Sequence, residues 1–269
     1  MTNSIDDATV REALAWIEQE AGIVVGPERA HFVRHRLAQR SGREDLIPRA
    51  GIGALLLEAV CTHETRLFRD LATWEQLQRV FVPRLRDEAA AGRREPVVRA
   101  WSAACSVGDE AYSLAALLRH ALPGWRVEVL ATDISEFALA QARTRRWPVN
   151  ALDGLPAAWR AAFDHDPNTG EVRPGEAIRR VVELRHTNLL HARPPRAHFD
   201  LILCRNVLIY FRRALQRRVV GQLLDGLAPG GWFVAGESEG LSALELPLRR
   251  IGDGAYARRE YTRRIPRQP

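Results

Sequence analysis

Short apolar runs alternate with helical segments from residue 97 onward, and this alternation restricts the possible folds more than any other feature of the chain. The predicted strands are 97–103, 127–132, 199–204 and 232–236. The predicted helices are 111–121, 135–143 and 212–227. Strands separated by helices favour parallel pairing, in a sheet whose faces are covered by those helices. We therefore predict an α/β fold with a mostly parallel sheet and flanking helices.

The residues before this region have a purely helical pattern. Residues 6–21 carry apolar side chains at helical spacing, with Asp6 or Asp7 as the N-cap and Gly22 as the stop. Further helices are predicted from Pro27 onward, over 51–60 and over 73–90. The arginine-rich helix that begins at Pro27 has two open interpretations: a solvated face, or a docking surface for an acidic helix.

A change of composition separates the two regions. The run AAAGRREP at residues 89–96 is typical of a domain boundary. We predict a helical N-terminal domain over residues 1–90 and an α/β domain over residues 91–269. Within the second domain the alternation fails between about 146 and 187, where turn-forming residues stand beside β-prone pieces. This pattern predicts a small inserted antiparallel β-subdomain.

The charge of the chain is weak evidence for function. Arginine supplies every one of the 39 basic side chains against 33 acidic ones, which gives a net charge of +6 and a pI near 10. Such a pI invites a nucleic-acid interpretation. The absence of lysine, together with abundant Ala, Gly, Leu and Pro, instead reflects GC-rich coding. We expect mostly solvated arginines and no nucleic-acid partner.

The lack of a membrane span and of a secretory signal in this sequence favours a cytoplasmic protein. No apolar run approaches the ~18 residues of a membrane span, and the acidic, amphipathic start is unlike a secretory signal. We expect no direct membrane insertion. Cys61, Cys105 and Cys204 match neither a disulfide framework nor a metal-ligand spacing, so we expect free thiols and no metal site.

Acidic residues follow two of the predicted strands. The loop AACSVGDEAYS after residue 103 has one glycine and then Asp109 and Glu110. A phosphate site would have several glycines and no carboxylates, so this loop suits a ligand with positive charge. The second strand ends at Asp133, which either caps the next helix or accepts hydrogen bonds from the ribose hydroxyls of an adenosine cofactor. S-adenosylmethionine has a ribose and a sulfonium cation and no phosphate.

Arg205 and Asn206 end the third apolar strand, in FDLILCRNVLIYF. Burying two strongly polar side chains without partners would cost several kcal/mol. Because ligands bind beyond the carboxyl ends of strands in open α/β sheets, we expect both residues at the ligand crevice.

Five separated blocks of this sequence resemble the CheR-type methyltransferases, which methylate glutamate side chains of bacterial chemoreceptors. The similarity runs from about residue 10 to residue 258. The blocks are THETRLFRD (62–70), WSAACSVGDEAYSLA (101–115), LATDIS (130–135), FDLILCRNVLIYF (199–211) and LAPGGWFVAGESEGL (227–241). No single block is specific for the family, but the order and spacing of all five together are.

The resemblance implies a Rossmann-like fold, S-adenosylmethionine as cofactor and S-adenosylhomocysteine as product. The implied cofactor-binding residues are His63, Thr65, Arg69, Glu110, Asp133, Asn188, Leu189, Arg205 and Asn206. The resemblance also implies that the bound cofactor and neighbouring backbone are the partners of Arg205 and Asn206. The implied partners are the glutamate-bearing cytoplasmic helices of chemoreceptors, with a receptor tethering peptide as a further candidate at the β-subdomain. We expect the enzyme to act as a monomer.

Three positions depart from the family pattern. His63 replaces the usual asparagine, GDEAYS replaces a pair of glutamates and a proline, and Glu237 stands where histidine is common. The helical region between 42 and 60 is also shorter than usual. The short region between 42 and 60 bears on receptor docking more than on the chemistry, the His63 departure bears on one cofactor contact, and Glu110 retains the carboxylate of the family pattern.

Methyl transfer to a glutamate needs no general base, because a free glutamate has a pKa of ~4.3 and is already ionised at neutral pH. We expect Arg69 to hold a carboxylate in a bidentate fork, and Tyr210 to donate a hydrogen bond at the mouth of the site. The alternatives are a surface ion pair for Arg69 and a core role for Tyr210.

Two other functions stay open at this point. One is a methyltransferase for RNA or a small molecule, although the chain lacks the N/D-P-P-Y/F signature of nucleobase methylation. The other is a non-catalytic signalling scaffold that binds the same cofactor.

Overall fold

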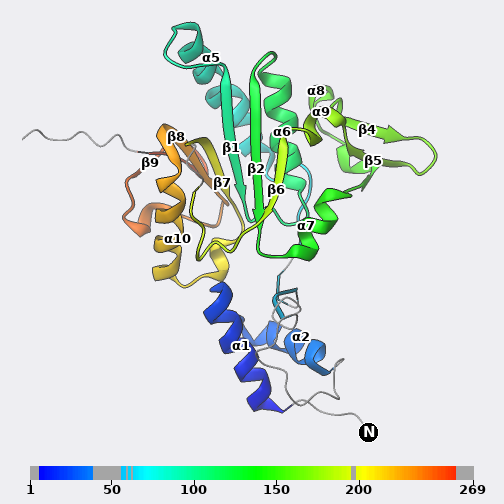
Figure 1. Ribbon diagram of the computed structural model, residues 1–269, viewed down its shortest axis with the longest axis vertical. Coiled ribbons are helices and arrows are strands. Elements are labelled where there is room, and N and C mark those ends of the chain that lie inside the picture. The colour runs from blue at the N-terminus through cyan, green and yellow to red at the C-terminus, as the bar shows by residue number, and fades with distance from the viewer. Residues whose placement is uncertain (1–5, 39–55, 59, 62, 195–197, 259–269) are drawn as a thin grey trace, which may run out of the picture.

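The computed structural model in Figure 1 describes residues 6–38, 56–58, 60–61, 63–194 and 198–258. Of the helix predicted over 51–60, residues 56–58 and 60 are helical, and the rest lies outside the described residues.

A seven-stranded sheet forms the centre of the molecule (Figure 1). Its strands are β1 (Val97–Ala103), β2 (Arg126–Asp133), β6 (Val182–His186), β7 (Phe199–Cys204), β8 (Leu227–Ala235), β9 (Leu248–Arg250) and β10 (Ala255–Arg258). Their order is β6-β2-β1-β7-β8-β10-β9, with parallel pairing from β6 to β8 and antiparallel pairing beyond. The chain builds outward from β1 in both directions, so the strand order reverses there. This reversal point is where open α/β sheets bind ligands.

Helices cover both faces of the sheet. The longer ones in this domain are α6 (Asp109–Ala121), α7 (Glu136–Arg143) and α10 (Arg213–Asp225). Side chains alternate along β7: Leu201 and Leu203 join the core cluster that contains α6, and Ile202 and Cys204 join the cluster that contains α10. Both faces are therefore buried, as the continuous apolar run of this strand predicts. The mostly parallel α/β sheet predicted from the sequence is confirmed.

The N-terminal helices lie beyond the carboxyl ends of the parallel strands (Figure 1). They are α1 (Asp7–Ala21) and α2 (Pro27–Ala38). The side chain of Asp6 accepts a hydrogen bond from the backbone N–H of Thr9, and Gly22 ends α1 with φ 72°. The positive φ of Gly22 favours glycine, and a Cβ there would lie 2.4 Å from the Leu215 side chain of α10, which would have to shift.

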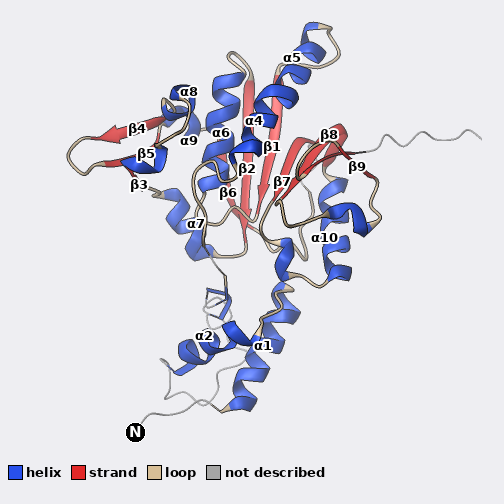
Figure 2. Cartoon of the chain, turned by 180° about the vertical axis from the view of Figure 1, so that it is seen from behind, coloured by secondary structure: helices blue, strands red, loops and turns tan. Residues whose placement is uncertain are grey.

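The helix predicted over residues 73–90 is real but has a π-helical turn. It comprises α4 (Leu71–Gln76), the π segment η1 (Leu77–Phe81) and α5 (Val82–Ala90). Pro83 explains the turn, because proline has no N–H for a bond to the preceding helical turn and its ring pushes that carbonyl away. The segment packs with α6 on the sheet, whereas we had grouped it with the N-terminal helices (Figure 2).

The inserted region forms a second, three-stranded antiparallel sheet. Its strands are β3 (Trp147–Pro148), β4 (Phe163–Asp166) and β5 (Glu171–Pro174), in the order β3-β5-β4. Short helices α8 (Ala157–Arg160) and α9 (Glu176–Arg179) and the 3₁₀ turn η2 (Val149–Leu152) complete it. Our predicted insertion, about 146–187, included β6, which instead pairs with β2 in the main sheet.

Two further 3₁₀ turns follow β7 and β8: η3 (Leu208–Tyr210) and η4 (Leu241–Leu244). In the part of the chain that the structure describes, no helix combines the length and apolarity needed to span a bilayer.

Candidate active site

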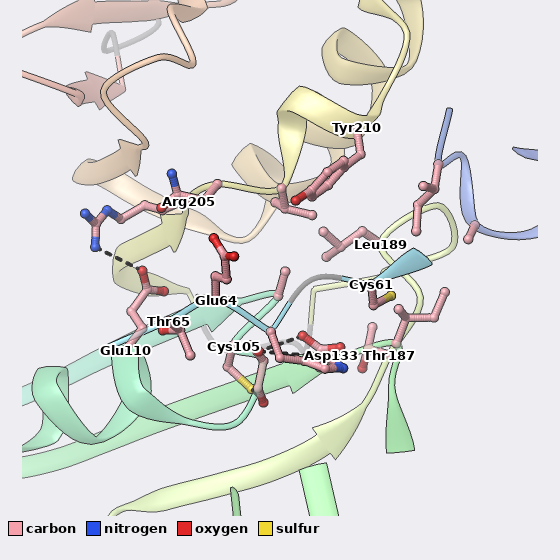
Figure 3. A pocket seen from close by; sticks show the side chains of 18 of the residues that line it. Cys61, Glu64, Thr65, Cys105, Glu110, Asp133, Thr187, Leu189, Arg205 and Tyr210 are labelled. Carbon is pink, nitrogen blue, oxygen red and sulfur yellow. Dashed lines mark hydrogen bonds and ion pairs between the residues drawn. The ribbon is translucent and has the colours of Figure 1, made fainter. Parts of the chain in front are cut away.

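A cavity of about 1030 Å³, including its open mouth, lies at the carboxyl ends of β1, β2 and β7 (Figure 3). All ten residues predicted from the sequence line it: His63, Thr65, Arg69, Glu110, Asp133, Asn188, Leu189, Arg205, Asn206 and Tyr210. They come from five separated parts of the chain. The fold therefore brings together the side chains that the sequence analysis selected.

Asp133 is held rigidly at the end of β2. Its carboxylate accepts hydrogen bonds from the backbone N–H groups of Ser106 (2.8 Å) and Ser135 (2.9 Å). The residue is 8% exposed, and burial raises its pKa, although these two hydrogen bonds oppose the shift. A carboxylate has about four acceptor positions, so two hydrogen bonds leave capacity for a vicinal diol. The helix-cap interpretation does not hold, since Ser135 caps α7 through its own hydroxyl.

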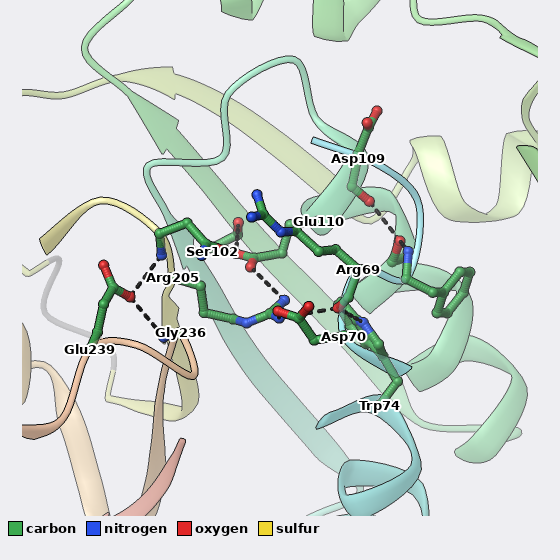
Figure 4. A network of polar contacts seen from close by, with 12 residues as sticks. Arg69, Asp70, Trp74, Ser102, Asp109, Glu110, Arg205, Gly236 and Glu239 are labelled. Carbon is green, nitrogen blue, oxygen red and sulfur yellow. Dashed lines mark hydrogen bonds and ion pairs between the residues drawn. The ribbon is translucent and has the colours of Figure 1, made fainter. Parts of the chain in front are cut away.

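Glu110 and Asp70 provide the partners of Arg205 (Figure 4). The Arg205 guanidinium, 2% exposed, forms ion pairs with Asp70 (2.5 Å) and Glu110 (3.3 Å). Ser102 donates a hydrogen bond to the other carboxylate oxygen of Glu110 (2.7 Å). Burial raises the pKa of Glu110, and the charge of Arg205 opposes the shift. We had expected the cofactor to partner Arg205, but the structure fills most of that role with protein carboxylates.

Arg205 also fixes the backbone at Arg69. It donates a hydrogen bond to the carbonyl oxygen of Arg69 (3.1 Å), which also accepts one from the indole of Trp74 (2.8 Å). The guanidinium of Arg205 lies 5.9 Å from the centre of the Trp74 ring. The side chain of Arg69 donates to the backbone carbonyl of Glu64 (2.9 Å). The end of β7 therefore positions the segment that carries Arg69.

Asn188 connects the site to the N-terminal helices. Its amide donates to the carbonyl of Glu20, at the end of α1 (2.6 Å), and its oxygen accepts from the N–H of Leu190 (3.0 Å). The next residue, Leu189, is buried and presents an apolar surface to the cavity. The loop after α1 reaches the cavity too, because the N–H of Val24 donates to the carbonyl of Tyr210 (2.8 Å).

Strained backbone surrounds the cavity. Of the six described non-glycine residues with positive φ, Ala104, Ser106 and Asn206 line it, and Phe68 and Asp70 flank Arg69. Each such conformation costs on the order of 1 kcal/mol and persists only where its surroundings enforce it. Their concentration here is typical of a functional site.

His63 forms an ion pair that the sequence analysis did not anticipate. Its Nε2 lies 3.0 Å from the carboxylate of Glu58, and its Nδ1 lies 3.2 Å from the hydroxyl of Ser106. Ser135 donates a hydrogen bond to the same Glu58 side chain. The hydrogen bond to Glu58 raises the pKa of His63, although burial opposes the shift.

This pair predicts a pH-dependent stability difference. A histidine whose pKa rises on folding contributes stability below its unfolded pKa and loses the contribution as the pH rises through the folded pKa. His63→Asn should therefore be less stable than the parent protein by about 1 kcal/mol at pH 5.5, with a smaller difference at pH 9. Urea unfolding at both pH values measures this, and a difference that grows with pH would contradict it.

Several residues that support or line the site were not selected individually from the sequence. Glu58 contacts His63, five residues away, whereas Asp70 and Glu239 contact Arg205 and Asn206 from distant parts of the chain. Single acidic residues in helices or turns are too common to be selected individually. Ser106 was visible only as a small residue in the loop after β1. Ile23 lines the cavity because α1 ends beside it, which depends on the packing of the N-terminal helices.

The residues present fit an adenosyl sulfonium ligand. The loop after β1 presents Glu110 rather than a phosphate cradle, and Asp133 offers acceptor positions for ribose hydroxyls. Both carboxylates are buried with raised pKa values, so a nearby positive charge favours their ionised forms. An open α/β sheet with this site at its reversal point defines an S-adenosylmethionine-dependent methyltransferase.

Comparison with known proteins narrows this class to one family. Residues 63–253 match the family model described as CheR methyltransferase, SAM binding domain. The chemotaxis protein methyltransferase of Vibrio parahaemolyticus is 32% identical over 259 residues, which cover 90% of this chain and 92% of that protein. Chemotaxis protein methyltransferase 2 of Pseudomonas aeruginosa is 34% identical over 269 residues, covering 94% and 92%. The chain belongs to the CheR methyltransferase family.

Proposed function

We propose that this protein transfers the methyl group of S-adenosylmethionine to glutamate side chains of chemoreceptors, forming methyl esters and releasing S-adenosylhomocysteine. The observation that carries the proposal is the convergence in one cavity of all ten residues selected from the sequence. The relatives named chemotaxis protein methyltransferase supply the substrate class.

The cofactor would supply an electrophilic methyl group on a sulfonium. We propose that Asp133 accepts hydrogen bonds from its ribose and that Leu189 packs against its adenine. Asn188 would act mainly by holding this wall against α1, because its NH₂ group donates to the Glu20 carbonyl at the end of α1 and its oxygen accepts from the N–H of Leu190. His63, Thr65, Glu110 and Asn206 would complete the wall around the cofactor.

Arg69 and Tyr210 would act on carboxylates at the site: that of the cofactor or of the substrate for Arg69, and that of the substrate for Tyr210. Arg69 would hold a carboxylate in its fork at the cavity, and Tyr210 would donate a hydrogen bond to the incoming glutamate. Figure 3 shows Tyr210 on the wall formed by the residues after β7. The rate would come from orienting two reactants and from excluding water around charges that neutralise each other during transfer.

We further propose that the protein acts on the cytoplasmic helices of receptors and works as a monomer. The small sheet offers a place for a receptor tethering peptide, because β4 is an edge strand of the order β3-β5-β4 and an extended peptide adds to such an edge.

The decisive experiment is incubation with radiolabelled S-adenosylmethionine and a membrane fraction that contains the receptors. We expect label in receptor bands that mild base releases as volatile methanol, the signature of a carboxyl methyl ester. Base-stable label on RNA or on small molecules would contradict the substrate assignment. Calorimetric cofactor binding without transfer to any receptor fragment would indicate a non-catalytic scaffold.

A further inference from the structure

Glu239 is a buried carboxylate at the edge of the site, with an unusual set of partners. It is 6% exposed. It accepts hydrogen bonds from four backbone N–H groups, those of Asn206 (2.7 Å), Leu208 (2.7 Å), Ile209 (3.3 Å) and Gly236 (2.7 Å). Such charge-assisted bonds are stronger than those between neutral groups. One side chain thus ties the residues after β7 to the end of β8 (Figure 4).

The local chain is shaped to place this carboxylate. Gly236 to Glu239 form a tight turn, in which the N–H of Glu239 donates to the carbonyl of Gly236 (2.9 Å) and the side chain folds back. A Cβ at Gly236 would lie 2.6 Å from the Glu239 carboxylate and 3.1 Å from the nitrogen of Asn206. The turn therefore requires glycine at this position.

The segment that Glu239 holds carries two residues of the site. Asn206 has φ 58°, a conformation that needs enforcement by its surroundings. The N–H groups bound by Glu239 stand at Asn206 and in the two residues immediately before Tyr210. The N–H of Tyr210 in turn donates to the carbonyl of Val207 (3.1 Å). The direction of the Tyr210 side chain thus depends on the turn after β7, whose N–H groups donate hydrogen bonds to the Glu239 carboxylate.

We propose that Glu239 is a positioning residue for methyl transfer, which acts through the backbone to hold Asn206 and Tyr210 in their working conformations. This proposal rests on the proposed function of the site. Glu239 itself does not line the cavity, so it would contribute geometry and no direct contact with either reactant.

The test replaces the carboxylate by an amide. Glu239→Gln keeps the size of the side chain but replaces one carboxylate oxygen by an NH₂ group. Backbone N–H groups that donate to that oxygen in the parent protein would face another donor in the variant. We expect kcat to fall by about 10-fold to 100-fold, with a smaller effect on the KM for S-adenosylmethionine. Calorimetry should show only about a threefold weaker affinity for S-adenosylhomocysteine, since most of the cofactor wall is unchanged.

Amide hydrogen exchange followed by NMR provides a readout that does not need the receptor. In Glu239→Gln the amides of Asn206, Leu208, Ile209 and Gly236 should exchange at least about 10-fold faster, while amides in β1 stay as in the parent protein. Glu237→Gln is the matched control: it makes the same change two residues away, on an exposed side chain outside the cavity, and should alter neither kcat nor exchange.

The outcomes separate this proposal from the proposed function. Unchanged kcat together with unchanged exchange at the four amides would overturn the positioning role. A failure of receptor methylation in the parent protein, with the exchange result as expected, would count against the proposed function alone. If Glu239→Gln does not fold, hydrogen exchange in the parent protein tests the proposal instead. The four amides should gain protection together when S-adenosylhomocysteine binds, and the lack of a common response would refute the proposal.

Discussion

Arg69→Ala should abolish methyl transfer to receptors, with a fall of at least about a hundredfold in a methyl-incorporation assay and the fold intact. Among the described residues its guanidinium donates to the Glu64 carbonyl, and a guanidinium has five N–H donors. Enough donors remain for a bidentate grip on a carboxylate. Each charge-assisted bond contributes ~1.5–3 kcal/mol, and each 1.36 kcal/mol in a barrier changes a rate about tenfold.

Two variants control for charge and for folding. Arg69→Lys keeps the positive charge without the planar fork, so its rate should lie between those of the parent protein and Arg69→Ala. Arg79→Ala removes an arginine whose side chain is 76% exposed, and should leave turnover and stability unchanged. Near-normal turnover of Arg69→Ala would refute the role of Arg69.

The sheet could be predicted because its signal is local. Each buried strand reads as an apolar run, and each covering helix has its own periodicity. The predicted strand at 199–204 agrees with β7 at both ends. The weaker predictions are those that depend on distant partners. Residues 182–186 look like part of a hairpin insertion, and only their pairing with β2 shows that they extend the main sheet.

Only part of the site could be predicted from the ends of predicted elements. His63, Thr65, Arg69, Asn188 and Leu189 were indicated by the resemblance to the CheR-type methyltransferases and by no local pattern. Asp133 and Arg205 stand at or just beyond the carboxyl end of a strand, and Glu110 stands in the first turn of the helix that follows β1. Parallel strands bring those ends to one edge. The partners of these residues were not predictable. Asp70 meets Arg205 because of an αL turn before α4, and nothing in the local sequence indicates that contact.

Replacing Arg205 by leucine should destabilise the fold strongly. The guanidinium is 2% exposed and neutralises Asp70 and Glu110, whose side chains are 22% and 14% exposed. Deleting one partner of a buried ion pair costs about 3–5 kcal/mol, because the remaining charge stays buried without compensation. Arg205→Leu should therefore reduce the free energy of unfolding by that amount in urea titrations at pH 7.5.

The control removes an arginine from an exposed pair. Arg212 pairs with Glu18, and their side chains are 68% and 40% exposed. Arg212→Leu should change stability by less than about 1 kcal/mol. Similar losses of unfolding free energy in Arg205→Leu and Arg212→Leu would show that the burial of the Arg205 ion pairs does not make them more important for stability than an exposed pair.

The pH dependence of the Arg205→Leu defect identifies its cause. Burial already raises the pKa of Glu110, and loss of the neighbouring positive charge raises it further. An acid whose pKa is higher in the folded state binds more protons there than in the unfolded chain, so stability increases as the pH falls through the folded pKa. The deficit of Arg205→Leu should thus shrink between pH 8 and pH 5.5, and adding Glu110→Gln should restore part of the lost stability at pH 8. A deficit that is independent of pH, with no rescue by Glu110→Gln, would attribute the loss to packing around Trp74 rather than to the unpaired carboxylate.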